Sequence, residues 1–239
     1  MKILSIGNSF SQDAQRYLHY IARANNKDLS CANLYIGGCS LKRHYSNILD
    51  HSASYRFEFN GCDTGIYIST ENALKSNSWD YITLQQASHE SFCYDKYMPY
   101  LTDICNYVKM QCPDSKILIH KTWAYPDNKD GILNVGYKLT EEMFADIDKA
   151  YKQACNAVKA DGTIPSGNAM LEAYRHNKNI AYRDHAHASL GFGRYMLGLV
   201  WFFTLYGHIE NFRHIEIFDE PLSDNEKNLA YKIASMVTK

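Results

Sequence analysis

Short apolar runs alternate along the chain with longer segments that have helical periodicity. The first run is KILSI at residues 2–6, and residues 11–26 after it place a row of apolar side chains on one helical face. Similar pairs of an apolar run and a helical segment recur toward the C-terminus. The pattern predicts strands over 2–6, 29–36, 79–84, 116–120 and 162–165, and helices over 11–26, 97–112, 137–159, 166–176, 190–206 and 223–237.

The order of these elements indicates the fold class. Strands that are separated by helices form parallel βαβ units, and their functional groups collect at the carboxyl ends of the strands. Residues 54–69 alternate on both sides of a turn-rich centre, which predicts an inserted β-hairpin. We therefore expect one α/β domain over 1–239, with three α/β/α layers and a flavodoxin-like, doubly wound, mainly parallel five-stranded sheet. No repeat or linker-like stretch divides the chain.

Composition narrows the class of partner. The chain has 239 residues and a formal net charge of −1, so it has no basic footprint for nucleic acid or an anionic membrane. Its seven cysteines are dispersed and form no CxxC pair, which indicates reduced thiols. The apolar run at 195–206 is too short to span a membrane, and the N-terminal run is too short for a signal peptide. We expect a cytoplasmic protein, unless an export signal preceded this sequence. The oligomeric state stays open.

Small and polar groups follow several predicted strands directly. Ser9 would lie at the N-terminus of the first helix, where the helix dipole favours negative charge. The backbone amides of Ser9 and Gly38 and the carboxamide of Gln85 are hydrogen-bond donors of the kind that stabilise a tetrahedral oxyanion. The groups at the strand ends are Gly7-Asn8-Ser9, Gly37-Gly38, Gln85-Gln86, His120 with Trp123, and Ser166-Gly167-Asn168.

A candidate base for this serine occurs late in the chain. In the stretch YRDHAHASLGFGRYM, Asp184 and His187 are three residues apart. At that spacing in a loop, the carboxylate can accept a hydrogen bond from the imidazole Nδ1–H. The Nε2 atom is then free to take a proton from Ser9. The catalytic order along the chain would be Ser, Asp, His.

Four short blocks together resemble the SGNH (GDSL-type) hydrolases. GNSFS is similar to their first block, IGGCS to the second and DHAH to the DxxH block. The resemblance implies a flavodoxin-like domain in which Ser9 is the nucleophile, Gly38 lies in the oxyanion hole, and Asp184 and His187 complete the triad. Asn8 stands where the family often has an aspartate. The resemblance implies an enzyme that uses no cofactor and no metal.

The third block departs from the usual Gly-x-Asn-Asp of the family. This chain has LQQASHES, which is similar to a branch that includes carbohydrate acetylesterases, where a glutamine replaces the asparagine. The resemblance implies that Gln85 is the third oxyanion donor, with Gln86 as the alternative. The substrate it implies is a short acyl ester, such as an acetyl ester, on a carbohydrate or a similar small molecule.

Two other functions stay open at this point. His185 and His187, with Asp184 beside them, could ligate a metal ion in a metal-dependent hydrolase. However, two histidines at i and i+2 point to one side only on a strand, and this segment has a loop-like sequence. The domain could also be a non-catalytic glycan-binding module, because a fold does not fix a function.

Several residues have a structural interpretation beside the functional one. His120, Trp123 and Tyr125 either form a pocket wall or pack together as an aromatic loop. The Gly7-Asn8-Ser9 turn could be a simple helix cap, and His185 could line the entrance or only be exposed. Cys39 lies next to the predicted oxyanion hole, where a small packed residue is the favoured interpretation.

Overall fold

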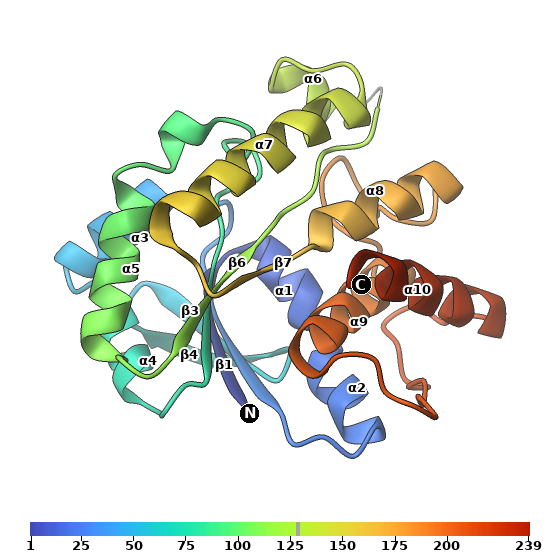
Figure 1. Cartoon of the computed structure of the whole chain (residues 1–239), viewed down its shortest axis with the longest axis horizontal. Coiled ribbons are helices and arrows are strands. Elements are labelled where there is room, and N and C mark those ends of the chain that lie inside the picture. Colours follow the sequence, from blue (N-terminus) through green and yellow to red (C-terminus); the bar gives the residue numbers. More distant parts are fainter. Residues whose placement is uncertain (128–129) are drawn as a thin grey trace.

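The computed structural model describes residues 1–127 and 130–239. Its centre is a mixed sheet whose described strands lie in the order β4-β3-β2-β1-β5-β6-β7, and helices cover both faces (Figure 1). The strands are β1 Lys2–Gly7, β2 Ser30–Tyr35, β3 Tyr55–Phe59, β4 Cys62–Ile68, β5 Tyr81–Leu84, β6 Lys116–His120 and β7 Gly162–Ile164.

The helices form two layers. On one face, α1 and α2 pack against α9, which also contacts α8 and α10; on the other face, α5 packs against α3, α4 and α7 (Figure 1). Their bounds are α1 Ser9–Gln15, α2 Leu18–Ala24, α3 Leu41–Leu49, α4 Thr70–Lys75, α5 Tyr100–Gln111, α6 Asp130–Asn134, α7 Thr140–Val158, α8 Ser166–His176, α9 Phe192–Tyr206 and α10 Asp224–Val237.

The predicted sheet of five strands is too small. The hairpin of β3 and β4 does not stand apart, because β3 pairs antiparallel with β2 and extends the sheet to seven strands in the described part of the chain. The five parallel strands keep the order β2-β1-β5-β6-β7, which is the 2-1-3-4-5 order of flavodoxin-like sheets. The α/β class and the three layers are as expected.

The predicted helices need correction in two respects. The single helix expected over 11–26 is two helices, since α1 ends at Gln15 and α2 begins at Leu18. Side-chain hydrogen bonds stabilise the break between the two helices: the Arg16 guanidinium donates to Asp219, and the Tyr17 hydroxyl donates to the Leu190 carbonyl. The helices α3, α4 and α6 were not predicted, because they are short and mostly polar.

The core lies on both sides of the central strand β1, where Ile3, Leu4 and Ile6 have no exposed surface. Helix α9 is apolar on nearly all sides and is buried among its helical neighbours, as a helix without a polar face must be. Within the described residues, no helix combines the length and apolarity that crossing a bilayer requires.

Candidate active site

The turn after β1 presents Ser9 at the first position of α1. Asn8 has extended backbone and caps the helix: its Oδ1 accepts a hydrogen bond from the Phe10 N–H at 3.0 Å. The Ser11 hydroxyl accepts from the Asn8 N–H at 3.0 Å, which completes a capping box. The cap fixes where the helix begins, and it therefore fixes Ser9 at the positive end of the helix dipole.

In the structure, His187 contacts Ser9 through one ring nitrogen and Asp184 through the other. His187 Nε2 lies 3.0 Å from Ser9 Oγ, and His187 Nδ1 lies 2.8 Å from Asp184 Oδ2. Both ring nitrogens of His187 therefore lie within hydrogen-bond distance of one of these two side chains. This is the geometry in which an imidazole can take the proton of a serine hydroxyl while a carboxylate orients it.

The backbone around Asp184 holds its carboxylate in place. Asp184 Oδ1 accepts hydrogen bonds from the N–H groups of Ala186 and His187 at 2.8 and 2.7 Å. Burial alone would raise the pKa of Asp184, but these N–H donors and the His187 imidazole bring it below its usual value. Asp184 is therefore a carboxylate at neutral pH, ready to stabilise an imidazolium.

The backbone N–H groups of Ser9 and Gly38 have no acceptor in the described part of the chain. Among the hydrogen bonds of the described residues, none uses the Ser9 or Gly38 N–H as donor. Gly37 and Gly38 are exposed, and Gly38 has a φ of +59°, a conformation in which a side chain is strained. Helix α3 begins just after this turn with Ser40 as its cap.

Gln85 is buried next to the turn that carries Ser9. Its Nε2 donates to Asn8 Oδ1 at 2.7 Å, and its Oε1 lies 2.6 Å from His120 Nδ1. Gln86, the alternative donor, uses its carboxamide differently. Gln86 Oε1 accepts from the Leu41 N–H and its Nε2 donates to the Lys96 carbonyl, so it links the start of α3 to the short helical turn at Tyr94–Lys96. Of the two glutamines, Gln85 is the one bonded to the serine turn.

The aromatic residues at and after the end of β6 pack beneath the candidate site and do not line an open pocket. His120 and Trp123 are fully buried, and Tyr125 is 6% exposed. Trp123 donates from Nε1 to the Ala186 carbonyl at 2.8 Å and stacks on Phe10, whose edge contacts His187. The packed-loop interpretation of these residues therefore fits the structure. His185, by contrast, is exposed and lies beside Gly131.

In the metal and thiol alternatives, His187 is bonded to other partners and Cys39 is buried in the structure. His187 directs its two nitrogens to Ser9 and Asp184, and no group of three metal-ligating side chains occurs within residues 1–127 and 130–239. Cys39 is fully buried, and burial raises the pKa of its thiol to about 12. A thiol with that pKa is a poor nucleophile at neutral pH.

An acidic residue and two arginines at this site were missed in the sequence. Asp13 has no exposed surface and accepts hydrogen bonds from Arg183, from Arg194 and from the Ala188 N–H. Two signals could have pointed to it. Asp13 lies four residues after Ser9 on the same helix, so both occupy one face, and Arg183 directly precedes Asp184.

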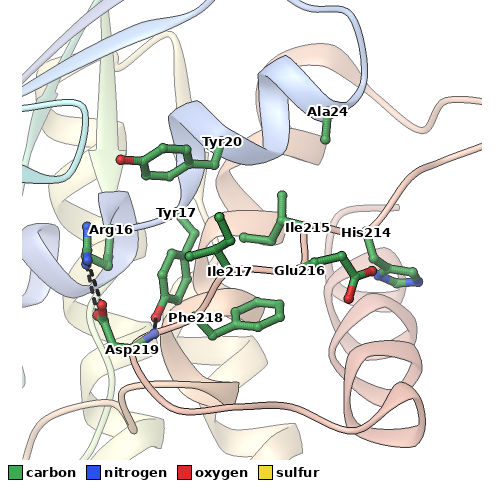
Figure 2. A pocket seen from close by; sticks show the side chains of 10 residues that line it. All are labelled: Arg16, Tyr17, Tyr20, Ala24, His214, Ile215, Glu216, Ile217, Phe218 and Asp219. Atoms are coloured by element: carbon green, nitrogen blue, oxygen red, sulfur yellow. Dashed lines mark hydrogen bonds and ion pairs between the residues drawn. The ribbon is translucent and has the colours of Figure 1, made fainter.

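A separate cavity of about 480 Å³ lies between α2 and the extended segment 214–219 (Figure 2). Its walls are mainly apolar, and Arg16 and Asp219 at one end are bonded to each other. The Tyr17 hydroxyl accepts from the Asp219 N–H in the same corner. Ser9, Asp184 and His187 do not line this cavity, so it is distinct from the candidate active site.

Comparisons with known proteins agree with this fold. The chain is 33% identical to a DUF4886 family protein from Bacteroides uniformis, with a TM-score of 0.92 over 99% of this chain and 94% of that protein. A candidate SGNH hydrolase from Slackia heliotrinireducens is 20% identical, with a TM-score of 0.62 over 86% and 98%. The psychrotrophic esterase EstA from Pseudoalteromonas is 10% identical, with a TM-score of 0.52 over 83% and 91%.

These similarities assign the fold and the family separately. At identities of 20% and below, the hydrolase structures show that the chain has the SGNH hydrolase fold. The narrower resemblance to carbohydrate acetylesterases rests on the third block of the sequence alone. No functionally curated protein matches the chain. Over residues 2–236 the sequence matches the family described as a domain of unknown function, DUF4886, and the chain belongs to that family.

Proposed function

We propose that this protein is a serine hydrolase that cleaves carboxylic esters through an acyl-enzyme. The observation that carries the proposal is the approach of His187 Nε2 to within 3.0 Å of Ser9 Oγ, with Asp184 2.8 Å from the other ring nitrogen. A nucleophile, a base and a group that orients the base are thus connected in one line. The similar solved structures support this reaction class through their fold.

In the proposed reaction, Ser9 Oγ attacks the ester carbonyl carbon while His187 Nε2 takes the hydroxyl proton. The carbonyl oxygen becomes an oxyanion that the Ser9 and Gly38 N–H groups and the Gln85 amide stabilise, each donor contributing about 3 kcal/mol in comparable enzymes. His187 then returns the proton to the departing alcohol. A water molecule, activated by His187, attacks the acyl-enzyme and releases the acid and Ser9.

The surroundings of Ser9 support a small acyl group and a large alcohol. Below the nucleophile, Asn8, Phe10 and Gln85 are each 2% exposed, so the floor of the site is packed. A packed floor favours an acetyl group over a long chain, which needs an apolar tunnel. Above it, the side chains of Asp184 and His187 are 38% and 28% exposed, which leaves room for a bulky leaving group. We propose an acetylated carbohydrate or a similar small ester.

Hydrolysis of p-nitrophenyl esters tests the proposal directly. The acyl chain would be lengthened from acetate to octanoate, and the wild type compared with Ser9→Ala and His187→Ala. We expect kcat/KM to be highest for acetate and to fall to the uncatalysed background in both variants. A surface variant, Ser223→Ala at the cap of α10, controls for the effect of serine replacement on folding. Activity that persists in Ser9→Ala would overturn the proposed nucleophile.

Two further measurements separate the other functions. A fluorophosphonate probe labels an activated serine, and we expect mass spectrometry to place the label on Ser9. A glycan-binding module would bind acetylated sugars without labelling at Ser9. Loss of activity with EDTA, and its recovery with a divalent metal, would favour the metal-dependent hydrolase. A set of acetylated sugars as substrates then tests the carbohydrate assignment.

A further inference from the structure

A chain of buried hydrogen bonds crosses the carboxyl edge of the sheet beneath Ser9. It links Ser166 after β7 to His120 at the end of β6, then to Gln85 after β5 and to Asn8 after β1. The distances are 2.9, 2.6 and 2.7 Å. All four side chains are at most 2% exposed, so water does not compete for these bonds.

Backbone atoms fix the direction of this chain at the Asn8 end. Asn8 Oδ1 faces the Phe10 N–H, which can only donate, and Asn8 Nδ2 faces the Cys39 carbonyl, which can only accept. The Asn8 carboxamide therefore cannot turn over without losing both bonds. Because Gln85 also bonds to Asn8 Oδ1, its NH2 group must be the end that faces Asn8.

The direction at Gln85 then determines the state of His120. With the Gln85 NH2 toward Asn8, its Oε1 faces His120 and needs a donor, so the hydrogen of His120 must be on Nδ1. Burial lowers the pKa of His120 to about 3, so the ring is neutral and Nε2 is an acceptor. The Ser166 hydroxyl therefore donates to Nε2. One tautomer satisfies every member of the chain.

We propose that His120 is a positioning residue that keeps the NH2 of Gln85 turned toward the Ser9 turn, with Ser166 holding His120 in its Nδ1–H tautomer. The inference rests on the proposed function, in which Gln85 is an oxyanion donor. One N–H of the Gln85 amide is bonded to Asn8, and the second is the one assigned to the oxyanion. Without the donor at His120, Gln85 Oε1 is left buried without a partner and Asn8 alone holds the amide, so its second N–H is no longer fixed toward the developing negative charge.

Two amide replacements at one position test this role. In His120→Asn, the side-chain NH2 can occupy the place of Nδ1 and still donate to Gln85 Oε1. In His120→Gln, the longer side chain carries its NH2 to the place of Nε2, near Ser166, and Gln85 loses its donor. Both variants lose the ring and keep a carboxamide, so a role in packing alone predicts similar losses of activity and of unfolding free energy in the two.

We expect kcat for p-nitrophenyl acetate to remain within about tenfold of wild type in His120→Asn and to fall about a hundredfold in His120→Gln, with KM little changed in both. His19 supplies matched controls, because its Nδ1 lies 2.6 Å from the Leu29 carbonyl at the opposite edge of the sheet. His19→Asn and His19→Gln should keep the kcat of the wild type. Equal kcat in the two His120 variants, or a higher kcat in His120→Gln, would overturn the proposal.

The tautomer of His120 can be measured without any substrate. In protein with ¹⁵N-labelled histidine, long-range ¹H–¹⁵N NMR spectra distinguish a protonated ring nitrogen from a bare one. We expect His120 to be protonated at Nδ1 and bare at Nε2, with the assignment confirmed by loss of its signals in His120→Asn. A hydrogen on Nε2 would disprove the direction of the chain even in an active enzyme. Conversely, the expected tautomer in a protein without esterase activity would contradict the proposed function and not the chain.

Discussion

Nη1 of Arg183 lies 2.9 Å from both carboxylate oxygens of Asp13, which lies one helical turn beyond Ser9. The same carboxylate accepts from the Ala188 N–H at 3.2 Å. Arg183 and Ala188 directly flank the segment from Asp184 to His187. Asp13 thus connects both ends of the loop that carries His187 to the helix that carries Ser9, and we expect these bonds to position His187 against the hydroxyl.

Replacement of Asp13 by asparagine should reduce both stability and turnover. The substitution leaves the guanidinium of Arg183 without its buried counter-charge, which typically costs about 3 kcal/mol of unfolding free energy. We expect kcat to fall at least about tenfold even where the variant is fully folded, because a small displacement of a base has that effect. Urea unfolding and esterase kinetics at the same temperature measure the two effects.

A matched control for Asp13 exists in the other helical layer. Asp148 on α7 is paired with Lys121 and Lys152, and its side chain is 22% exposed. Asp148→Asn removes a partly buried charge without touching the loop, so it should lower stability and leave kcat unchanged. A folded Asp13→Asn enzyme with the turnover of the wild type would show that other contacts position the loop.

Asp184→Asn should be less damaging than Ser9→Ala or His187→Ala. An asparagine oxygen can still accept from the Ala186 and His187 N–H groups, so the turn is kept. The loss is the carboxylate that holds the imidazole in the correct tautomer and stabilises the imidazolium, and in a buried protease triad this loss costs about 10⁴-fold in kcat. Here the Asp184 side chain is 38% exposed, and water can bond to His187 Nδ1 in its place. Comparison of kcat for the three variants checks this ranking, and equal losses would contradict it.

The sequence was most informative where local pattern determines structure. The apolar runs predicted the parallel strands to within a few residues, because a strand that is buried on both faces needs continuous apolar side chains. The triad candidates also followed from local signals, since Ser9 follows a core strand directly and Asp184 and His187 are three residues apart. Parallel strand order then placed the groups from β1, β2 and β5 at one edge of the sheet.

What the sequence could not show depends on contacts between distant segments. The sequence of the hairpin does not indicate that β3 pairs with β2, because strand pairing depends on how the whole sheet assembles. His120 was predicted equally as a pocket residue or as a packed one, since its burial depends on α8 and α9 above it. The role of Asp13 depends on Arg183, 170 residues away. Such pairs become visible only once the chain is folded.

Trp123→Phe should separate the packing of this residue from its hydrogen bond. A phenylalanine keeps an aromatic ring against Phe10, but it loses the Nε1–H that donates to the Ala186 carbonyl at 2.8 Å. The Ala186 carbonyl is then left without a hydrogen-bond donor, which costs about 1–3 kcal/mol of unfolding free energy. Because Ala186 lies between Asp184 and His187, we also expect kcat to fall a few-fold.

Trp79→Phe, which loses a similar bond to the Ala73 carbonyl far from the loop, is the control. An equal fall in kcat in both variants would contradict this role.

The two fully buried histidines should make the protein sensitive to mild acid. Burial lowers the pKa of both His44 and His120 to about 3, whereas an unfolded chain has a histidine pKa of about 6.5. Between these values the unfolded state binds more protons than the folded state, so the free energy of unfolding falls as the pH falls. The contribution is complete above about pH 6.5 and is lost at about 1.4 kcal/mol per pH unit for each histidine.

His120→Asn should therefore change the pH dependence of stability as well as its size. Between pH 6.5 and 5 the wild type should lose about 2 kcal/mol of unfolding free energy more than the variant, because one of the two buried histidines no longer titrates on unfolding. Urea unfolding at intervals of half a pH unit measures this slope. Trp79→Phe is the control, since it removes no ionisable group, and its slope should equal that of the wild type. A slope in His120→Asn that matches the wild type would mean that His120 takes up a proton within the folded protein, which is incompatible with its single neutral tautomer.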